Sequence, residues 1–123
     1  MNLLKQWFGR HPHGHTASVP VVQWAGQSGK EYAYKVHPIT TPFRPLPGNF
    51  IYAKQDEECN WIPLYIAQTR DMHQRLEGHF PVEAAIDHGA THVHAHYDNV
   101  GHAARCMEER DLIERWHPHY NDF

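Results

Sequence analysis

Hydrophobic and polar residues alternate in several stretches of the chain in the manner of β-strands. In residues 30–37 the side chains of Tyr32, Tyr34 and Val36 fall on one face, and residues 90–97 alternate strictly. A turn signal, Gly-Gln-Ser-Gly, precedes the first of these stretches and follows another β-rich segment. Residues 19–37 are therefore predicted to form a β-hairpin. Two further strands are expected, at residues 50–53 and 61–67.

Helical signals follow these strands. Thr69 or Asp71 can cap a short helix that runs to about residue 77, and Pro81 suits the first turn of a second helix. Residues 103–116 place apolar side chains near a 3.6-residue period, which predicts an amphipathic helix. From residue 48 the predicted order is strand, strand, helix, helix, strand, helix. This order indicates an α+β fold with a small three-stranded sheet packed by helices.

The pattern divides the chain into three parts. Residues 1–18 contain proline, glycine and histidine without periodicity and are expected to be a flexible tail. Residues 19–47 combine the hairpin with a proline-rich connector, and residues 48–123 hold the α+β pattern. A chain of 123 residues is long enough to bury a core.

Charge is distributed unevenly along the chain. The net charge is −3, made up of +4 in residues 1–47 and −7 in residues 48–123. Phosphate binding depends mostly on lysine and arginine, so an acidic C-terminal part is unusual for a nucleic-acid-binding protein. Thirteen histidines would add positive charge below neutral pH.

The composition also indicates where in the cell the protein is expected. No apolar run approaches the ~20 residues that span a bilayer, so we expect no membrane partner and a cytoplasmic location. Cys59 and Cys106 are the two cysteines, and in a chain of this size they are expected to be reduced thiols.

Two segments carry a resemblance to a known family. Residues 64–79 contain Tyr-Ile-Ala, an arginine ten positions after that tyrosine and a histidine four positions later. Farther on, Glu109 opens a Glu-x-x-Leu-Ile run, and the chain continues to a Pro-x-x-Asn ending. Over residues 48–121 this order and spacing resemble the GIY-YIG nuclease superfamily. The whole chain also resembles a group of small bacterial GIY-YIG-domain proteins, through residues 24–30 and 89–92.

The resemblance implies metal-dependent cleavage of DNA phosphodiester bonds and a role for each matched residue. Tyr65 would orient or deprotonate the attacking water, and Arg75 would hold a phosphate oxygen. His79 would serve as a base or phosphate contact. Glu109 would bind one Mg²⁺ or Mn²⁺ ion with waters and substrate oxygens, and Asn121 would buttress the site.

Each of these residues could instead have a purely structural role. Tyr65 could be a core tyrosine of a strand, and Arg75 could pair with Asp71 at the i,i+4 spacing of a helix. Glu109 could be an exposed glutamate in a charged helix. Glu108 is adjacent, but a helix turns it by about 100° away from Glu109, so it is not expected to share the site.

Two signature positions depart from the family pattern. Phe50 stands where the first tyrosine is expected and has no hydroxyl, although Tyr52 shares that strand face and could partly replace it. Ala67 replaces the glycine of Tyr-Ile-Gly, and its methyl could crowd the substrate or a neighbouring strand. Gln68 stands where some relatives carry lysine. These changes predict a slow or specialised endonuclease.

The alternating histidines of residues 90–97 are a separate signal. His92, His94 and His96 share one face of the predicted strand. The first and third are ~13 Å apart along a strand, too far for all three to bind one ion, so a metal would need two of them and another group. A polar face exposed to solvent is the alternative. The histidines of the tail could bind metal weakly.

Two other classes of function remain open on the sequence. One is a catalytically inactive nucleic-acid-binding module that keeps the fold and Arg75. The other is a protein-interaction domain that uses the aromatic hairpin, with Trp24, Tyr32 and Tyr34, as an edge for partner strands. The sequence leaves the strandedness and base preference of a DNA substrate open, and also the oligomeric state.

Overall fold

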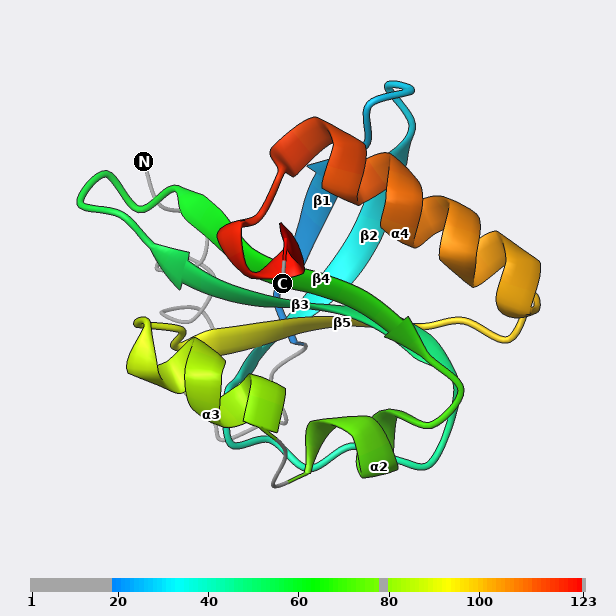
Figure 1. The fold of residues 1–123 in the computed structure, drawn as a ribbon, viewed down its shortest axis with the longest axis horizontal. Helices are drawn as coiled ribbons and strands as arrows, with labels where there is room; N and C mark the ends of the chain where they lie inside the picture. The colour runs from blue at the N-terminus through cyan, green and yellow to red at the C-terminus, as the bar shows by residue number, and fades with distance from the viewer. Residues whose placement is uncertain (1–18, 78–79, 123) are drawn as a thin grey trace, which may run out of the picture.

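The computed structural model describes residues 19–77 and 80–122. The predicted tail, residues 1–18, and His79 lie outside the described residues. The elements, in chain order, are β1 (Val21–Ala25), β2 (Glu31–Pro38), β3 (Gly48–Gln55), β4 (Trp61–Thr69), α2 (Met72–Leu76), α3 (Phe80–Asp87), β5 (His92–Tyr97), α4 (His102–Trp116) and the 3₁₀ helix η1 (His119–Asp122), as Figure 1 shows. The fold is α+β, and each predicted strand and helix is confirmed to within a few residues.

All five strands form one curled antiparallel sheet, in the order β1-β2-β5-β3-β4. The prediction of a three-stranded sheet with a separate hairpin is corrected here, because β2 pairs with β5 and places Lys35 opposite Ala95. A three-stranded sheet would leave the second edge of β5 with unpaired backbone groups, and the hairpin pairs them. Hydrophobic alternation predicts strands but does not record which strands pair.

Helices cover both faces of the sheet (Figure 1). On one face Phe50 and Tyr52 of β3 pack with Met72 of α2 and Ala85 of α3. On the other face the intervening residues of β3, with Trp24 and Tyr34 of the hairpin, pack against Leu112 of α4. Successive side chains of β3 point to opposite faces of the sheet, so this one strand contributes to both cores. None of the described helices is long and apolar enough to cross a membrane.

The turn of the hairpin is fastened to α4. Asp111 accepts hydrogen bonds from the backbone N–H and the hydroxyl of Ser28, at 2.9 and 2.7 Å. A Cβ on Gly26 would lie 2.0 Å from a carboxylate oxygen of Asp111, so a larger residue here would displace that carboxylate. The indole of Trp116 donates to the carbonyl of Ala25 at 2.8 Å. The hairpin is thus part of the core that α4 completes.

The aromatic residues of the hairpin do not form an exposed patch. Trp24 and Tyr34 are buried, and Tyr32 is partly buried and donates a 2.8 Å hydrogen bond to Asp111. Burial of these rings against α4 stabilises this domain from within, and the use of the hairpin as an edge for partner strands stays a prediction. Among the described strands, β1 pairs with β2 alone.

Candidate active site at the edge of strand β4

The outer edge of β4 is closed by side chains from the C-terminal part of the chain. Asn121 of η1 accepts from the backbone N–H of Ile66 at 2.8 Å and donates to its carbonyl at 2.7 Å. Two residues farther along β4, the backbone N–H of Gln68 donates to Glu109 of α4 at 3.1 Å. These contacts replace the missing neighbouring strand, and they bring Glu109 and Asn121 to β4.

Tyr65 and Arg75 meet on the face of the sheet that α2 covers. The short helix α2 begins after Asp71, whose carboxylate accepts from the backbone N–H of Gln74 at 3.0 Å. This cap, which the sequence predicted, lets α2 present Arg75 toward the sheet. The guanidinium donates to the phenol oxygen of Tyr65 at 2.9 Å. Both side chains are partly buried.

A bulge in the β3–β4 pairing lies beside Tyr65. Tyr52 is opposite Tyr65, but the next residue of β3, Ala53, is opposite Pro63, so Leu64 is the extra residue. Proline and a bulge both suit an edge strand, because neither can maintain a regular ladder. The bulge places Leu64 and Tyr65 in the same core cluster.

The two departures from the family pattern lie in the core beneath Arg75. Phe50 is fully buried, and the guanidinium of Arg75 stands 5.5 Å from the centre of its ring. Ala67 is opposite Phe50 and is buried in the same cluster, so its methyl packs inside the domain. Of the two predicted effects of this methyl, its position inside the domain favours contact with the neighbouring strand.

Tyr52 lies next to the same pair. Its ring is stacked on that of Tyr65, with 6.3 Å between centroids and an interplanar angle of 25°. Its hydroxyl is buried and has no hydrogen-bond partner among the described residues. Burial raises the pKa of this phenol, and the nearby charge of Arg75 partly offsets that rise. Tyr52 therefore shares the face of Phe50, as predicted, but its hydroxyl is held inside the protein.

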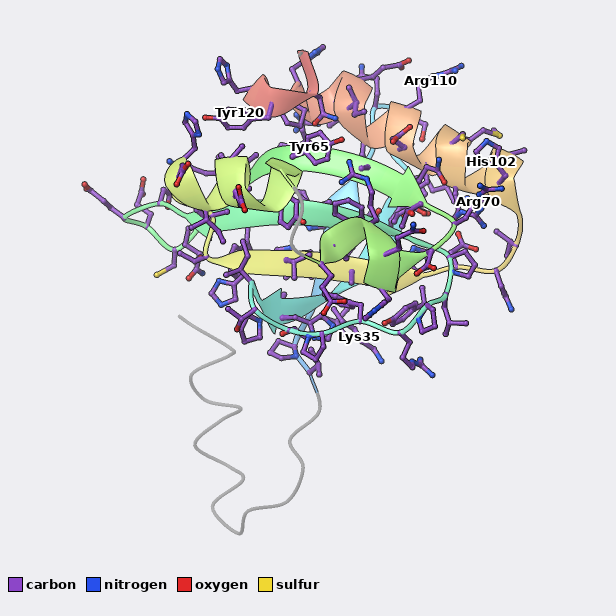
Figure 2. The ribbon with its side chains drawn as sticks, turned by 60° about the horizontal axis from the view of Figure 1, so that its bottom comes forward. Lys35, Tyr65, Arg70, His102, Arg110 and Tyr120 are labelled. Atoms are coloured by element: carbon purple, nitrogen blue, oxygen red, sulfur yellow. The ribbon has the colours of Figure 1, made fainter. Side chains whose placement is uncertain are left out.

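Glu109 stands among cationic side chains. Partial burial raises the pKa of its carboxyl, while the Gln68 hydrogen bond and the charges of His102, Arg110 and Arg75 act in the opposite direction. His102 and Arg110 belong to α4, whereas Arg75 comes from α2. Figure 2 shows His102 and Arg70 at the same end of the molecule, where β4 ends and α4 begins. Tertiary structure thus gathers positive charge in the acidic part of the sequence.

A buried arginine supports the site from behind. Arg105 is one turn before Glu109 in α4, and its Nε donates to the side-chain oxygen of Gln68 at 3.3 Å. Its backbone carbonyl accepts from the amide of Asn49 at 3.0 Å. Gln68 is therefore held by its side chain while its backbone N–H binds Glu109. We infer that Gln68 is a positioning residue.

The structure gathers Tyr65, Arg75, Gln68, Glu109 and Asn121 around β4, whereas Phe50 and Tyr52 lie beneath them in the core. Sequence reasoning missed the contributions of Arg105, His102 and Arg110. One signal could have found His102 and Arg105. These residues precede Glu109 by seven and four positions, and residues at such spacings share one face of a helix. Their pairing with β4 had no local signal.

The alternating histidines share one face of β5, as predicted, but that face is largely covered, and His92 and His96 are only partly exposed. His94 is fully buried and its Nδ1 accepts from the indole of Trp24 at 2.9 Å. Burial lowers its pKa to about 3. The prediction of a polar solvent face is wrong because the hairpin and α4 cover these strands. Cys59 and Cys106 are free thiols, as predicted.

Family models, curated proteins and solved structures were compared with the chain, and none of them matches it.

Proposed function

We propose that the protein is a metal-dependent endonuclease of GIY-YIG type that hydrolyses DNA phosphodiester bonds at the edge of β4. The observation that carries this proposal is the hydrogen bond between a phenol and a guanidinium beside a carboxylate that binds the same strand and lies within the electrostatic influence of that guanidinium. Tyr65 belongs to β4, Arg75 to α2 and Glu109 to α4. Their spacing in the sequence matches the family motif, and their proximity in space is independent of that match.

Arg75 is suited to hold the scissile phosphate. A guanidinium offers several N–H donors in one plane, and one of them already binds Tyr65, which fixes its direction. Its remaining donors can bind non-bridging phosphate oxygens and stabilise the charge that develops on them. His102 and Arg110, near Glu109, add positive charge for the neighbouring phosphates.

Tyr65 is suited to position the nucleophile. Because its oxygen accepts the hydrogen bond of Arg75, its own hydrogen remains free to donate to a water or to a phosphate oxygen. In the proposed reaction Tyr65 orients the attacking water and relays its proton: the phenol oxygen accepts the proton of the water while the phenol's own hydrogen passes to a non-bridging phosphate oxygen.

The donors at Glu109 fit one hard divalent ion. One carboxylate oxygen accepts from Gln68, and the other can face a metal. Mg²⁺ is commonly held by one or two carboxylates together with waters and substrate phosphates. A bound ion would supply Lewis-acid polarisation of a phosphate oxygen. Three cationic side chains near Glu109 oppose a further cation, so we expect the ion to bind with DNA and only weakly without it.

The buried core favours a second candidate function, an inactive nucleic-acid-binding module. Phe50 has no hydroxyl, and the hydroxyl of Tyr52 is fully enclosed. Tyr65 would then be left without the second strand phenol of the family pattern. Such a module would retain DNA binding through Arg75 and lack turnover.

The test is cleavage of labelled single- and double-stranded DNA with Mg²⁺ or Mn²⁺, comparing the native chain with Glu109→Gln. Glutamine keeps an oxygen for the Gln68 hydrogen bond and removes the charge. We expect the variant to lose cleavage by about 100-fold or more. Glu57→Gln is the matched control, because Glu57 is an exposed acid in the loop between β3 and β4, and it should cut normally.

DNA affinity measured together with cleavage separates the two candidates. Arg75→Ala should weaken binding in both, whereas Arg115→Ala, at an exposed position near the other end of α4, should not. Binding that depends on Arg75 without any cleavage would establish the module and exclude the enzyme. If neither binding nor cleavage is found, both candidates fail.

A further inference from the structure

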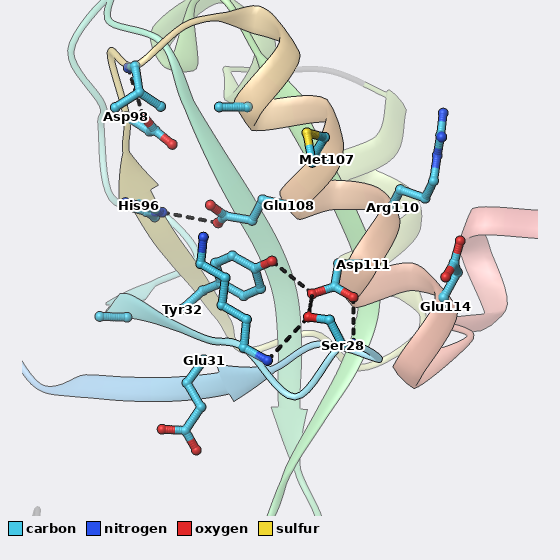
Figure 3. A pocket seen from close by; sticks show the side chains of 14 residues that line it. Ser28, Glu31, Tyr32, His96, Asp98, Met107, Glu108, Arg110, Asp111 and Glu114 are labelled. Carbon is cyan, nitrogen blue, oxygen red and sulfur yellow. Dashed lines mark hydrogen bonds and ion pairs between the residues drawn. The ribbon is translucent and has the colours of Figure 1, made fainter.

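A second group of potential ligands lies around the side chain of Glu108, which points about 100° away from that of Glu109 on α4. His96 is near the end of β5, Asp98 follows that strand, and Glu108 is on α4. One ligand atom from each of the three lies within 4.8 Å of the others. The closest pair is Nδ1 of His96 and Oε2 of Glu108, at 3.0 Å. Figure 3 shows the three side chains along one wall of a pocket.

These distances suit a small divalent ion. Ligands that bind Zn²⁺ at about 2.0–2.2 Å in a tetrahedron are roughly 3.3 Å apart. The group observed here brackets that separation, from 3.0 Å to 4.8 Å, so small side-chain movements would complete it. One imidazole nitrogen and two carboxylate oxygens are ligands that Zn²⁺ accepts, and such three-ligand sites keep a fourth position for water.

Two of the ligands are already held in place by neighbours. Glu108 is buried and accepts a hydrogen bond from the hydroxyl of Tyr34. Asp98 accepts from the backbone N–H of Val100 at 2.8 Å, which leaves its other oxygen free. Hydrogen bonds of this kind orient ligands around a metal and make their oxygens available in one direction.

The surroundings favour a cation. The three residues line an open pocket of about 730 Å³, so an ion can enter and retain a water. Five carboxylates and only two lysine or arginine side chains line this pocket. This charge balance attracts a divalent ion and disfavours DNA. It is the reverse of the balance around Glu109.

We propose that His96, Asp98 and Glu108 form a binding site for one Zn²⁺ ion, with a fourth position open to the pocket. The ion would take the place of the hydrogen between Nδ1 of His96 and the Glu108 carboxylate. It would link β5, the turn that follows it and α4. This site is independent of the proposed nuclease activity and binds its ion without DNA.

Calorimetric titration of the metal-free full chain with Zn²⁺ tests the site. The histidines of the tail could bind the ion as well, so the titration uses a chain with His11, His13 and His15 all changed to asparagine. We expect one ion per chain. Asp98→Asn and Glu108→Gln should each weaken binding by at least about tenfold, and Glu114→Gln, an exposed acid of α4 that lines the same pocket, should not.

Two further readouts keep the proposal falsifiable. NMR of the histidine rings should show that Zn²⁺ shifts Nδ1 of His96 in particular, which does not depend on a variant that could unfold. Glu109→Gln should leave Zn²⁺ affinity unaltered, which separates this site from the one at β4. Absence of binding in the tail-substituted chain, an equal loss in Glu114→Gln, or an unshifted His96 nitrogen would overturn the proposal.

Discussion

Glu108 and Glu109 are neighbours in the sequence, yet they serve two different regions of the molecule. Glu109 reaches the edge of β4, where Arg75, His102 and Arg110 surround it with positive charge. Glu108 is buried on the other side of α4, between Tyr34 and His96, next to an acidic pocket. The helix separates them by about 100°, and the strands on either side give each carboxylate a different environment.

The comparison teaches that one helix can present two carboxylates in opposite electrostatic environments. At the β4 edge positive charge would oppose a metal until a phosphate neutralises it, which suits the proposed substrate-dependent site. The second region, which we call the histidine face, consists of His94, His96, Glu108, Trp24 and Tyr34. Two of these residues, His96 and Glu108, are proposed zinc ligands, and their contacts hold them against the core. Changes to the histidine face should therefore appear mainly in stability, and changes at the β4 edge mainly in DNA cleavage.

The largest effect is expected from acid, through His94. Its pKa is about 3 in the folded chain, against 6.5 as its ordinary value, because burial disfavours the charged ring. As pH falls from 6.5 to 3 the unfolded chain takes up a proton that the folded chain does not, so the free energy of unfolding decreases. The full loss is roughly 4 kcal/mol, at about 1.4 kcal/mol for each pH unit.

Urea unfolding between pH 6.5 and 5, in metal-free buffer, measures this slope. His94→Gln keeps an acceptor for Trp24 and should flatten it, whereas His88→Gln, at an exposed position, should not. His96 acts in the opposite direction: the Glu108 contact raises its pKa, so its stabilisation is present at low pH and is lost as pH rises through its folded value. An unchanged slope in His94→Gln would contradict the assignment.

The next effect compares the two glutamates directly. Glu108→Ala leaves the buried hydroxyl of Tyr34 without its acceptor and should cost about 3 kcal/mol of stability. Glu109→Ala removes one hydrogen bond from a partly exposed backbone N–H and should cost about 1 kcal/mol. Urea unfolding at neutral pH measures both, with Glu114→Ala as a near-neutral control. Equal losses of stability from the substitutions at positions 108 and 109 would contradict the difference in environment between the two glutamates.

A smaller effect is expected at the closed edge of β4. Asn121→Ala removes both hydrogen bonds to the backbone of Ile66 and should cost about 2 kcal/mol. Asn121→Asp retains the acceptor but sets a carboxylate oxygen against the carbonyl of Ile66, so it should cost at least as much as alanine. Chemical denaturation gives both values. If neither substitution lowers stability, the edge is held by other contacts.

The smallest effect is expected from Mg²⁺ without DNA. Because cations surround Glu109, Mg²⁺ at about 1 mM should stay below its dissociation constant and raise the free energy of unfolding by less than about 0.5 kcal/mol. Thermal unfolding with and without Mg²⁺ provides the measurement, in a chain that carries Asp98→Asn to remove the second site. A large stabilisation would show that Glu109 binds the ion alone.

Much of the local structure could be predicted. Alternation in residues 30–37 and 90–97 identified two strands, and the period of residues 103–116 identified α4. Asp71 was predicted as one of two possible caps, and it caps α2. These features depend on residues a few positions apart. Their backbone preferences and spacing can be recognised within one short segment of the sequence.

The candidate site was predictable only in part. The spacing of Tyr65, Arg75 and Glu109 marked them by resemblance, and the structure brings them together at β4. The roles of Arg105 and Gln68 were not marked, because their contact joins β4 to a helix 37 positions away. The same holds for the charge around Glu109, which comes from two helices.

The sequence by itself determined where strands and helices lie and which side chains share a face of each. Only the tertiary structure decided that the hairpin pairs with β5, that His94 is buried and that Glu108 and Glu109 face different surroundings. Trp24 and His94 are 70 positions apart, and Tyr34 and Glu108 are 74 apart. Such pairs form for two reasons: packing removes apolar surface from water, and each buried polar group then needs a hydrogen-bond partner. Neither requirement can be recognised from residues that are close together in the sequence.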